Sequence, residues 1–177
     1  MKAYLTLKNL LSVVIAFIFI QSMFFKFTDS PETIYIFSTL GQWSGFPWFG
    51  NYGGYMVGLV ELIASILLFT RWHAFGAMMA LAVISGAIIF HLFTPLGVAM
   101  PTYADSLLLN SDTAIHALTM ATTDEKYNVI RDDLLFIPTD FDSGTLFIMA
   151  CVVWLSALTL TVKQLKDPSS NLRKLFS

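Results

Sequence analysis

Four long apolar runs limit what this chain can fold into. They cover residues 10–27, 52–69, 74–95 and 143–162. Each approaches the ~20 residues that a helix needs to cross the ~30 Å hydrocarbon core of a bilayer. An open strand cannot satisfy its backbone hydrogen bonds in lipid, and the runs lack the alternation of a barrel strand. The sequence therefore predicts an all-α fold, a bundle of four transmembrane helices.

The composition agrees with a single integral membrane domain over residues 1–177. Apolar residues make up 56% of the chain and charged residues 12%, about half the charged share of a typical soluble domain. The single cysteine, Cys151, excludes an intramolecular disulfide, a CxxC redox pair and a cysteine-cluster metal site. No basic patch lies outside the C-terminal tail, so nucleic-acid binding is not expected.

The first apolar run also resembles the core of a secretory signal, with Lys2 and Lys8 before it. It is long, however, and it ends at Lys26 rather than at a small-residue cleavage site. We expect a retained transmembrane helix.

The basic residues predict the orientation in the membrane. With four spans, one side carries both termini and the turn at 70–73, and it holds seven of the ten basic residues: Lys2, Lys8, Arg71, Lys163, Lys166, Arg173 and Lys174. The opposite side holds ten of the twelve acidic residues: Asp29, Glu32, Asp105, Asp112, Asp124, Glu125, Asp132, Asp133, Asp140 and Asp142. The positive-inside rule then predicts a multi-pass protein of the cytoplasmic (inner) membrane with both termini cytoplasmic.

A short helix is expected between the first two spans. Ser30 has the character of an N-cap, Pro31 suits the first helical position, and Gly41 would follow the last turn. Six aromatic residues come next: Trp43, Phe46, Trp48, Phe49, Tyr52 and Tyr55. They fit either an interfacial belt at the outer headgroups or the mouth of an aromatic-lined ligand site.

The segment 97–142 is the one sizeable region expected outside lipid, on the extracytoplasmic side. Its length predicts some structure of its own, with a short strand or helix over 111–119 and a helix over 123–135. His116 has no cysteine or histidine neighbour at metal-ligand spacing, so we expect an exposed polar residue there and no metal site.

Four polar residues within the spans are the candidate ligand-binding residues: Gln21, Lys26, Glu61 and His91. Ionisable groups are costly inside a bilayer and usually serve a function when they occur there. Counting ~1.5 Å per residue from the cytoplasmic ends predicts two layers. Gln21 would lie level with Glu61 near mid-bilayer, and Lys26 would lie with His91 near the outer interface, its amine extended to the headgroups.

Small residues predict which helix faces meet. Gly54, Gly58, Glu61 and Ser65 share one face of their helix, and the next span repeats the pattern with Gly76, Ala80, Ala87 and His91. Such faces allow close helix packing, so both titratable residues should point into protein. Two interpretations of Glu61 stay open, a neutral carboxylic acid that joins helices and a proton relay or ligand anchor.

The chain resembles the DoxX family of small four-helix membrane proteins. The resemblance covers nearly the whole chain through QSMFFKFT, GLVELIASILLF, GAMMALAVISGAIIFHLFTPLG and DSGTLFIMACVVW. It implies an accessory subunit associated with membrane redox or quinone chemistry, with a quinone as the cofactor to look for and an oxidoreductase as the partner. It leaves open whether the chain is itself catalytic and whether it forms oligomers.

A second function class stays open from the sequence. The acidic segment 97–142 could recruit an extracytoplasmic protein, which would make the chain a non-catalytic scaffold or assembly factor. A proton-coupled transporter fits less well, because no helix is visibly broken in mid-membrane and no substrate-sized polar set exists.

Overall fold

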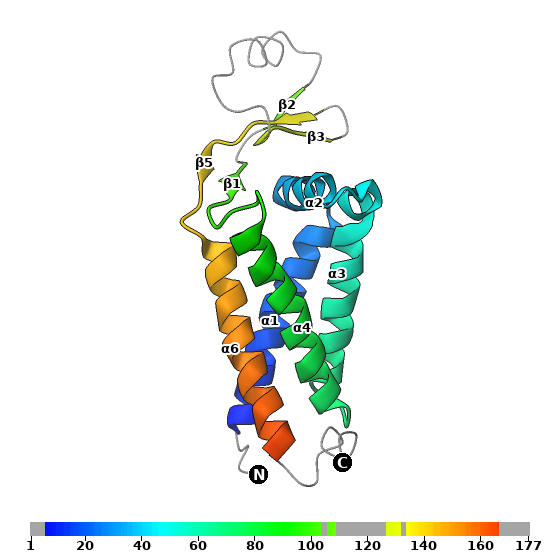
Figure 1. Ribbon diagram of the computed structural model, residues 1–177, viewed down its shortest axis with the longest axis vertical. Coiled ribbons are helices and arrows are strands. Elements are labelled where there is room, and N and C mark those ends of the chain that lie inside the picture. Colours follow the sequence, from blue (N-terminus) through cyan, green and yellow to red (C-terminus); the bar gives the residue numbers. More distant parts are fainter. Residues whose placement is uncertain (1–5, 104–105, 109–126, 132–133, 167–177) are drawn as a thin grey trace.

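Four long helices stand side by side as a bundle (Figure 1): α1 (Leu7–Phe27), α3 (Pro47–Leu67), α4 (His73–Phe93) and α6 (Thr145–Lys166). The computed structural model describes residues 6–103, 106–108, 127–131 and 134–166. A fifth helix, α2 (Pro31–Ser44), lies across the end of the bundle at which α1 finishes. The fold is mainly helical, so the predicted all-α class holds for the bundle but not for the short strands that follow α4.

Three of the helices, α1, α4 and α6, are long and apolar enough to cross a membrane. This supports the prediction of a membrane protein. Helix α3 is equally long, at 21 residues, but Asn51, Glu61 and several glycines lie within it. These residues lower its hydropathy, although the helix occupies an equivalent place in the bundle (Figure 1).

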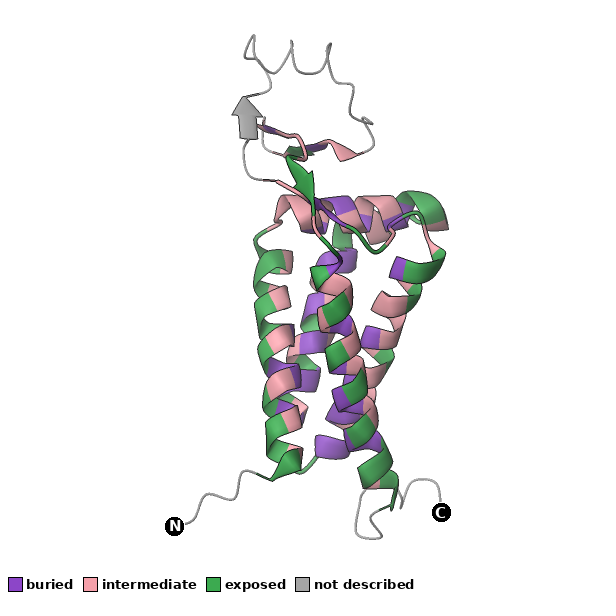
Figure 2. Ribbon diagram, turned by 90° about the vertical axis from the view of Figure 1, so that its left-hand side faces the viewer, coloured by how far each residue is buried: buried purple, intermediate pink, exposed green. Residues whose placement is uncertain are grey.

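The outward-facing parts of the helices are exposed (Figure 2), and many of the exposed residues have large apolar side chains. Phe17, Phe24 and Phe93 are 67%, 66% and 73% exposed, respectively. A soluble monomer rarely leaves such a continuous apolar surface open to water. The interior is filled instead by a buried cluster: Ile15, Phe19, Ala64, Leu68, Ala77, Ala80, Ile84, Ala150, Val153, Ala157 and Leu160. Alanines at the helix contacts in the interior, with phenylalanines on the outer surface, are the pattern expected of helices packed in lipid.

Helix α2 begins as predicted and ends later than predicted. Ser30 is its N-cap and accepts a hydrogen bond from the Thr33 backbone N–H, with Pro31 at the first position. The predicted end at Gly41 is wrong, because the helix continues to Ser44 and is capped by Gly45, which adopts a left-handed φ of 73°. Gly41 serves a packing role, since a Cβ there would lie 2.8 Å from the Gly50 backbone of α3.

The predicted small-residue faces are buried, but the one on α3 packs differently from what was expected. Gly54, Gly58, Glu61 and Ser65 are all buried. Gly54 lies against Phe37 of α2, and Gly58 lies against Phe27 of α1. On α4, Gly76 contacts the last turn of α3. The α3 face therefore packs mainly on α1 and α2, and α4 packs lower on α3.

Short strands form a small head beyond α2 (Figure 1). Strand β1 (Pro101–Thr102) pairs antiparallel with β5 (Asp140–Phe141). Strands β2 (Ser106–Leu108), β4 (Leu134–Phe136) and β3 (Val129–Arg131) form a second antiparallel sheet in the order β2-β4-β3.

The helix predicted over 123–135 is wrong in the part that the structure describes, where β3 and the start of β4 lie. Each strand has only three residues, too few for a local periodicity, so long-range pairing decides the conformation. The elements predicted over 111–119, and His116 with them, lie outside the described residues.

Two charged residues tie the head to the helices. Arg131 of β3 donates through Nη1 to the carbonyl oxygens of Thr28 and Asp29, at 2.8 and 2.6 Å. Asp142 accepts hydrogen bonds from the backbone N–H groups of Met100, Gly144 and Thr145. Burial raises the pKa of Asp142, but these hydrogen bonds outweigh it and hold the pKa below its ordinary value of 3.8.

Candidate functional site

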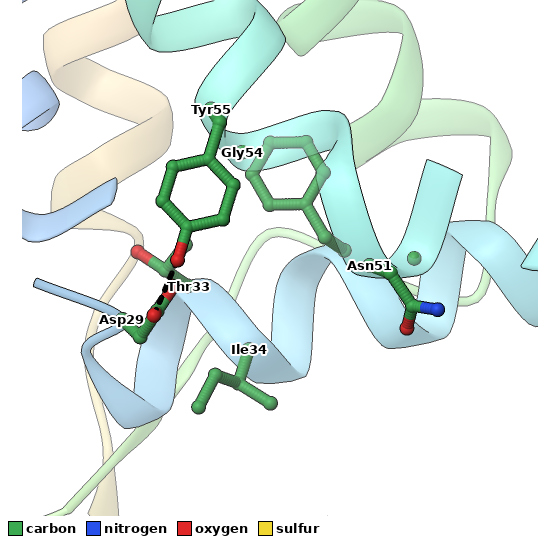
Figure 3. A pocket seen from close by; sticks show the side chains of 8 residues that line it. Asp29, Thr33, Ile34, Asn51, Gly54 and Tyr55 are labelled. Atoms are coloured by element: carbon green, nitrogen blue, oxygen red, sulfur yellow. Dashed lines mark hydrogen bonds between the residues drawn. The ribbon is translucent and has the colours of Figure 1, made fainter. Parts of the chain in front are cut away.

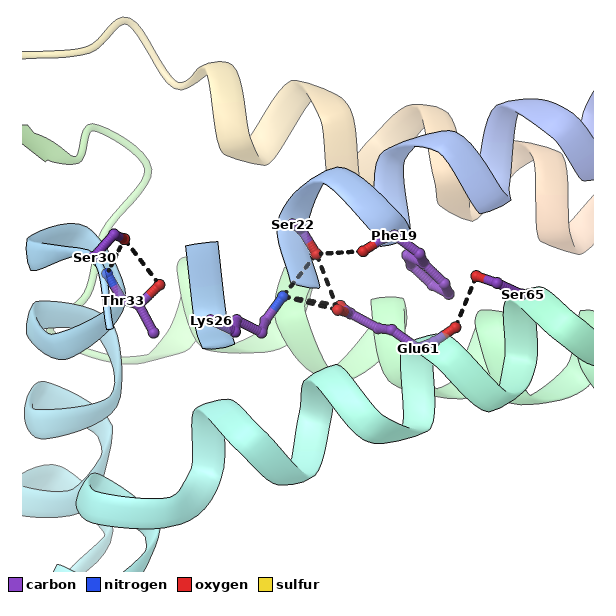
Figure 4. Close-up of polar contacts among 7 residues, drawn as sticks. All are labelled: Phe19, Ser22, Lys26, Ser30, Thr33, Glu61 and Ser65. Atoms are coloured by element: carbon purple, nitrogen blue, oxygen red, sulfur yellow. Dashed lines mark hydrogen bonds and ion pairs between the residues drawn. The ribbon is translucent and has the colours of Figure 1, made fainter. Parts of the chain in front are cut away.

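A buried ion pair joins α1 to α3. The Lys26 Nζ lies 2.9 Å from Glu61 Oε2 and 3.1 Å from Oε1 (Figure 4). Ser22 completes the cluster, because its Oγ accepts from Lys26 Nζ at 2.7 Å and donates to Glu61 Oε2 at 2.9 Å. The Lys26 and Glu61 side chains are only 15% and 6% exposed. Two opposite charges out of water are stable only when paired and hydrogen-bonded in this way.

The geometry of α1 explains why Lys26 reaches Glu61. Helical side chains lean toward the N-terminus of their helix, so the amine of Lys26 reaches the level of Ser22, one turn below its own Cα. Gly58 of α3 leaves room for this path: a Cβ there would come within 3.6 Å of the Lys26 Cδ and 3.0 Å of the Phe27 ring. The lysine stem therefore runs down between the helices.

The two predicted polar layers are wrong. Glu61 pairs with Lys26 and Ser22, whereas Gln21 is exposed on the outside of α1. Lys26 does not reach outward to the headgroups, because its amine points the other way. The depth count placed each residue at its Cα and ignored the direction and length of the lysine side chain.

A second polar cluster closes the opposite end of the bundle. His73 is 4% exposed, and its Nε2 and Nδ1 lie 3.1 Å from Ser12 Oγ and from Gln164 Nε2, respectively. An amide nitrogen can only donate, so Nδ1 accepts and Nε2–H donates to Ser12. Ser12 in turn donates to the Lys8 carbonyl oxygen at 2.9 Å. This chain of hydrogen bonds ties α1, α4 and α6 together.

An apolar layer separates the two clusters. Ser22 follows Ser12 by ten residues, which places them ~15 Å apart along α1. Between these levels lie the buried side chains of Ile15 and Phe19, with Ala64 of α3 against them. Among the described residues no hydrogen bond crosses this layer, so the ion pair and the His73 cluster are two separate polar sites in this part of the chain.

His91 has a partner of its own, away from the ion pair. Its Nδ1 lies 2.6 Å from the Gly97 carbonyl oxygen, and a carbonyl can only accept, so Nδ1 carries the proton. Its ring packs edge-on against Phe147 of α6. His91 therefore fixes the turn that leads from α4 into the head.

A pocket of about 250 Å³ opens between α2 and α3 (Figure 3). Its lining comprises Asp29, Thr33, Ile34, Phe37, Gly50, Asn51, Gly54 and Tyr55. The Tyr55 hydroxyl donates to Asp29 Oδ2 across its mouth. Asp29 is the one charged residue among the described residues of the lining.

Sequence reasoning missed several members of these sites. Ser22 could have been found from its position four residues before Lys26, on the same helix face. His73 was overlooked because it precedes the predicted third span by one residue. The Asp29–Tyr55 contact had no local signal, since its two residues are 26 positions apart.

In the described part of the chain, no group of three or more His, Cys, Asp or Glu side chains is placed to hold a metal ion. The Lys26–Ser22–Glu61 cluster remains the one charged pair buried between described helices. It can donate hydrogen bonds from an ammonium and accept them at a carboxylate. No protein-family model, no curated protein and no solved structure matches the chain.

Proposed function

We propose that the chain is a four-span protein of the cytoplasmic membrane with both termini in the cytoplasm. The bundle contains four long helices, and the start of α1 lies at the same end as the end of α6 (Figure 1). Lys8, Arg71, Lys163 and Lys166 lie at that end or beside it, which supports the orientation. Helix α3 is the fourth span in this proposal, and its glutamate is neutralised by Lys26.

The function that we propose is that of an accessory subunit of a membrane redox system that holds a quinone. The single observation that carries it is the buried Lys26–Glu61 pair. An ion pair in the middle of a bundle is weak evidence for stability, because apolar residues of similar size often do as well. Its presence at membrane depth therefore favours a role in binding. The resemblance to the DoxX family supports the choice of a quinone.

The chemistry of the pair suits a lipophilic ligand that bears carbonyl groups. Lys26 is the more exposed partner, at 15% against 6% for Glu61. A quinone carbonyl can replace Ser22 as an acceptor of the Lys26 ammonium, while Glu61 keeps the charge neutralised. Such a charge-assisted hydrogen bond is worth about 1.5–3 kcal/mol.

The test is the quinone content of the purified full-length protein. We expect quinone in solvent extracts of the wild type and at least about tenfold less in Lys26→Met, the loss that corresponds to one charge-assisted hydrogen bond. Lys163→Met makes the same chemical change on an exposed part of α6 and should retain the wild-type content. A wild type without quinone, or equal content in all three proteins, would refute the proposal.

The head supports a second candidate, a scaffold that recruits an extracytoplasmic protein. Its strands lie beyond α2 (Figure 1), where Val129 of β3 packs in one buried cluster with Tyr35 of α2. Hydrogen bonds of Arg131 and Asp142 also hold them to the helices. A head fixed in this way would present a partner at a constant height above the membrane. Crosslinking from Ile130, which is 60% exposed, should capture one defined partner. Crosslinks to many unrelated proteins, or to none, would count against the scaffold.

A further inference from the structure

We infer that the pocket between α2 and α3 binds the headgroup of a zwitterionic phospholipid that carries a primary ammonium, the chemistry of phosphatidylethanolamine. The inference rests on the membrane placement in the proposed function and is independent of quinone binding. It concerns a different set of residues, because Ser22, Lys26 and Glu61 are not among the residues that line the pocket.

The position of the pocket is that of a lipid headgroup. It lies where α2 crosses the end of the bundle (Figure 3). Trp43, Phe46 and Trp48, at the junction of α2 and α3, are about half exposed, and exposed aromatic residues of this kind concentrate at the level of the headgroups. Below the pocket, Leu59 follows Tyr55 by one turn and is 52% exposed. Acyl chains can therefore continue along the apolar surface of α3.

The lining selects an ammonium that can donate hydrogen bonds. Among the described residues of the lining, Asp29 supplies the one negative charge, and none is a lysine, arginine or histidine. The Asp29 carboxylate uses Oδ2 to accept from Tyr55, and no other hydrogen bond to it occurs among the residues that the structure describes. A primary ammonium has three donors for the remaining acceptor sites, whereas a trimethylammonium has none.

The backbone holds Asp29 in place for this role. Asp29 has a φ of 49°, the one positive φ of a non-glycine residue in the described part of the chain. Such left-handed conformations are uncommon outside glycine and tend to persist at functional sites. The Arg131 guanidinium bonds to the Asp29 carbonyl oxygen at 2.6 Å and so stabilises the conformation.

The same lining disfavours a headgroup without an ammonium. A headgroup that carries only a phosphate and a glycerol has no cation for the Asp29 carboxylate, whereas phosphatidylethanolamine supplies one.

The experiment is a lipid competition on the purified full-length protein. Native mass spectrometry would be run with equimolar phosphatidylethanolamine, phosphatidylcholine and phosphatidylglycerol of identical acyl chains. We expect the wild type to retain phosphatidylethanolamine about tenfold over each of the others, the effect of one charge-assisted hydrogen bond. Equal retention of phosphatidylethanolamine and phosphatidylcholine would overturn the inference. Equal retention of phosphatidylethanolamine and phosphatidylglycerol would also overturn it, because it would indicate recognition of the phosphate alone.

A matched pair of variants assigns the preference to the pocket. Asp29→Asn should abolish it, whereas Asp140→Asn, the same change on exposed β5, should keep it. A preference that survives Asp29→Asn would overturn the inference. The wild-type competition stays decisive on its own if Asp29→Asn does not fold. Membrane placement is tested separately, since a protein that carbonate washes release from membranes without detergent is not integral, whatever lipid it prefers.

Discussion

The ammonium of Lys26 lies 2.9 Å from the Glu61 carboxylate, one helical turn below the Lys26 backbone. The pair joins the outer half of α1 to the middle of α3, and Ser22 fills the remaining acceptor and donor positions (Figure 4). Because the Glu61 side chain is only 6% exposed, its carboxylate cannot exchange a lost partner for bulk water. The consequences for stability are therefore asymmetric.

A double-mutant cycle should reveal this asymmetry. Lys26→Met leaves a buried carboxylate unpaired and is expected to lower the free energy of unfolding by about 3–5 kcal/mol. Lys26→Met combined with Glu61→Leu removes both charges and should recover most of that loss. Thermal unfolding in detergent measures both effects. A single variant as stable as the wild type would mean that the pair is not buried in the folded protein.

The close approach of α2 to α3 depends on glycine. In Gly41→Ala the new Cβ would lie 2.8 Å from the Gly50 backbone, which cannot move aside cheaply, so we expect a loss of about 1–3 kcal/mol. Gly86→Ala is the matched control, because its Cβ would meet nothing within 4 Å. It should stabilise α4 by about 0.5–1 kcal/mol through lower backbone entropy. Equal melting temperatures for the two variants would contradict the packing described above.

The lowered pKa of Asp142 predicts that the folded protein loses stability in acid. Its pKa is lowered in the folded protein, so its stabilising effect is complete above the unfolded pKa of about 3.9 and is lost as the pH falls through the folded value. In Asp142→Asn this part of the acid sensitivity should disappear, at a cost near neutral pH of about 0.5–2 kcal/mol for the weakened cap. Unfolding curves from pH 7 to pH 3 measure both. Parallel curves for wild type and variant would contradict the prediction.

Gln164 should contribute to the stability of the bundle at its other end, where it hydrogen-bonds to His73. Gln164→Ala leaves the Nδ1 of buried His73 without its donor, and we expect a loss of about 1–3 kcal/mol. Lys163→Ala, one residue away on the exposed side of α6, should change stability by less than about 0.5 kcal/mol. Unfolding in detergent compares the two. A larger loss for the lysine variant would place the helix in a different rotation.

The helices could be predicted because hydrophobic runs and caps are local signals. Ser30 shows this well, since an N-cap is defined by residues within one turn of it. The prediction of where α2 ends was wrong because a glycine such as Gly41 can either stop a helix or allow a close contact. Only the position of Gly50 in the folded protein decides between the two. The strands of the head were not predicted for a similar reason, because their pairing joins residues that are far apart in the chain.

The candidate site was half predictable. Lys26 and Glu61 stood out because charges in apolar helices are costly. Their pairing was missed because it depends on the path of the long lysine side chain past Gly58. Counting residues along each helix gives the depth of the backbone and not the path of a side chain. His91 was identified too, yet its partner is a backbone carbonyl, and such a contact leaves no mark in the sequence.

The most direct test of the central claim is a quinone titration of the purified protein, wild type against the Lys26→Met/Glu61→Leu variant. The double variant is expected to recover most of the stability lost in Lys26→Met, and an unfolding curve that matches the wild type assigns a loss of binding to the missing polar contacts. We predict saturable binding to the wild type and a dissociation constant at least about tenfold higher for the variant, the equivalent of one lost charge-assisted hydrogen bond. Equal dissociation constants would contradict the account.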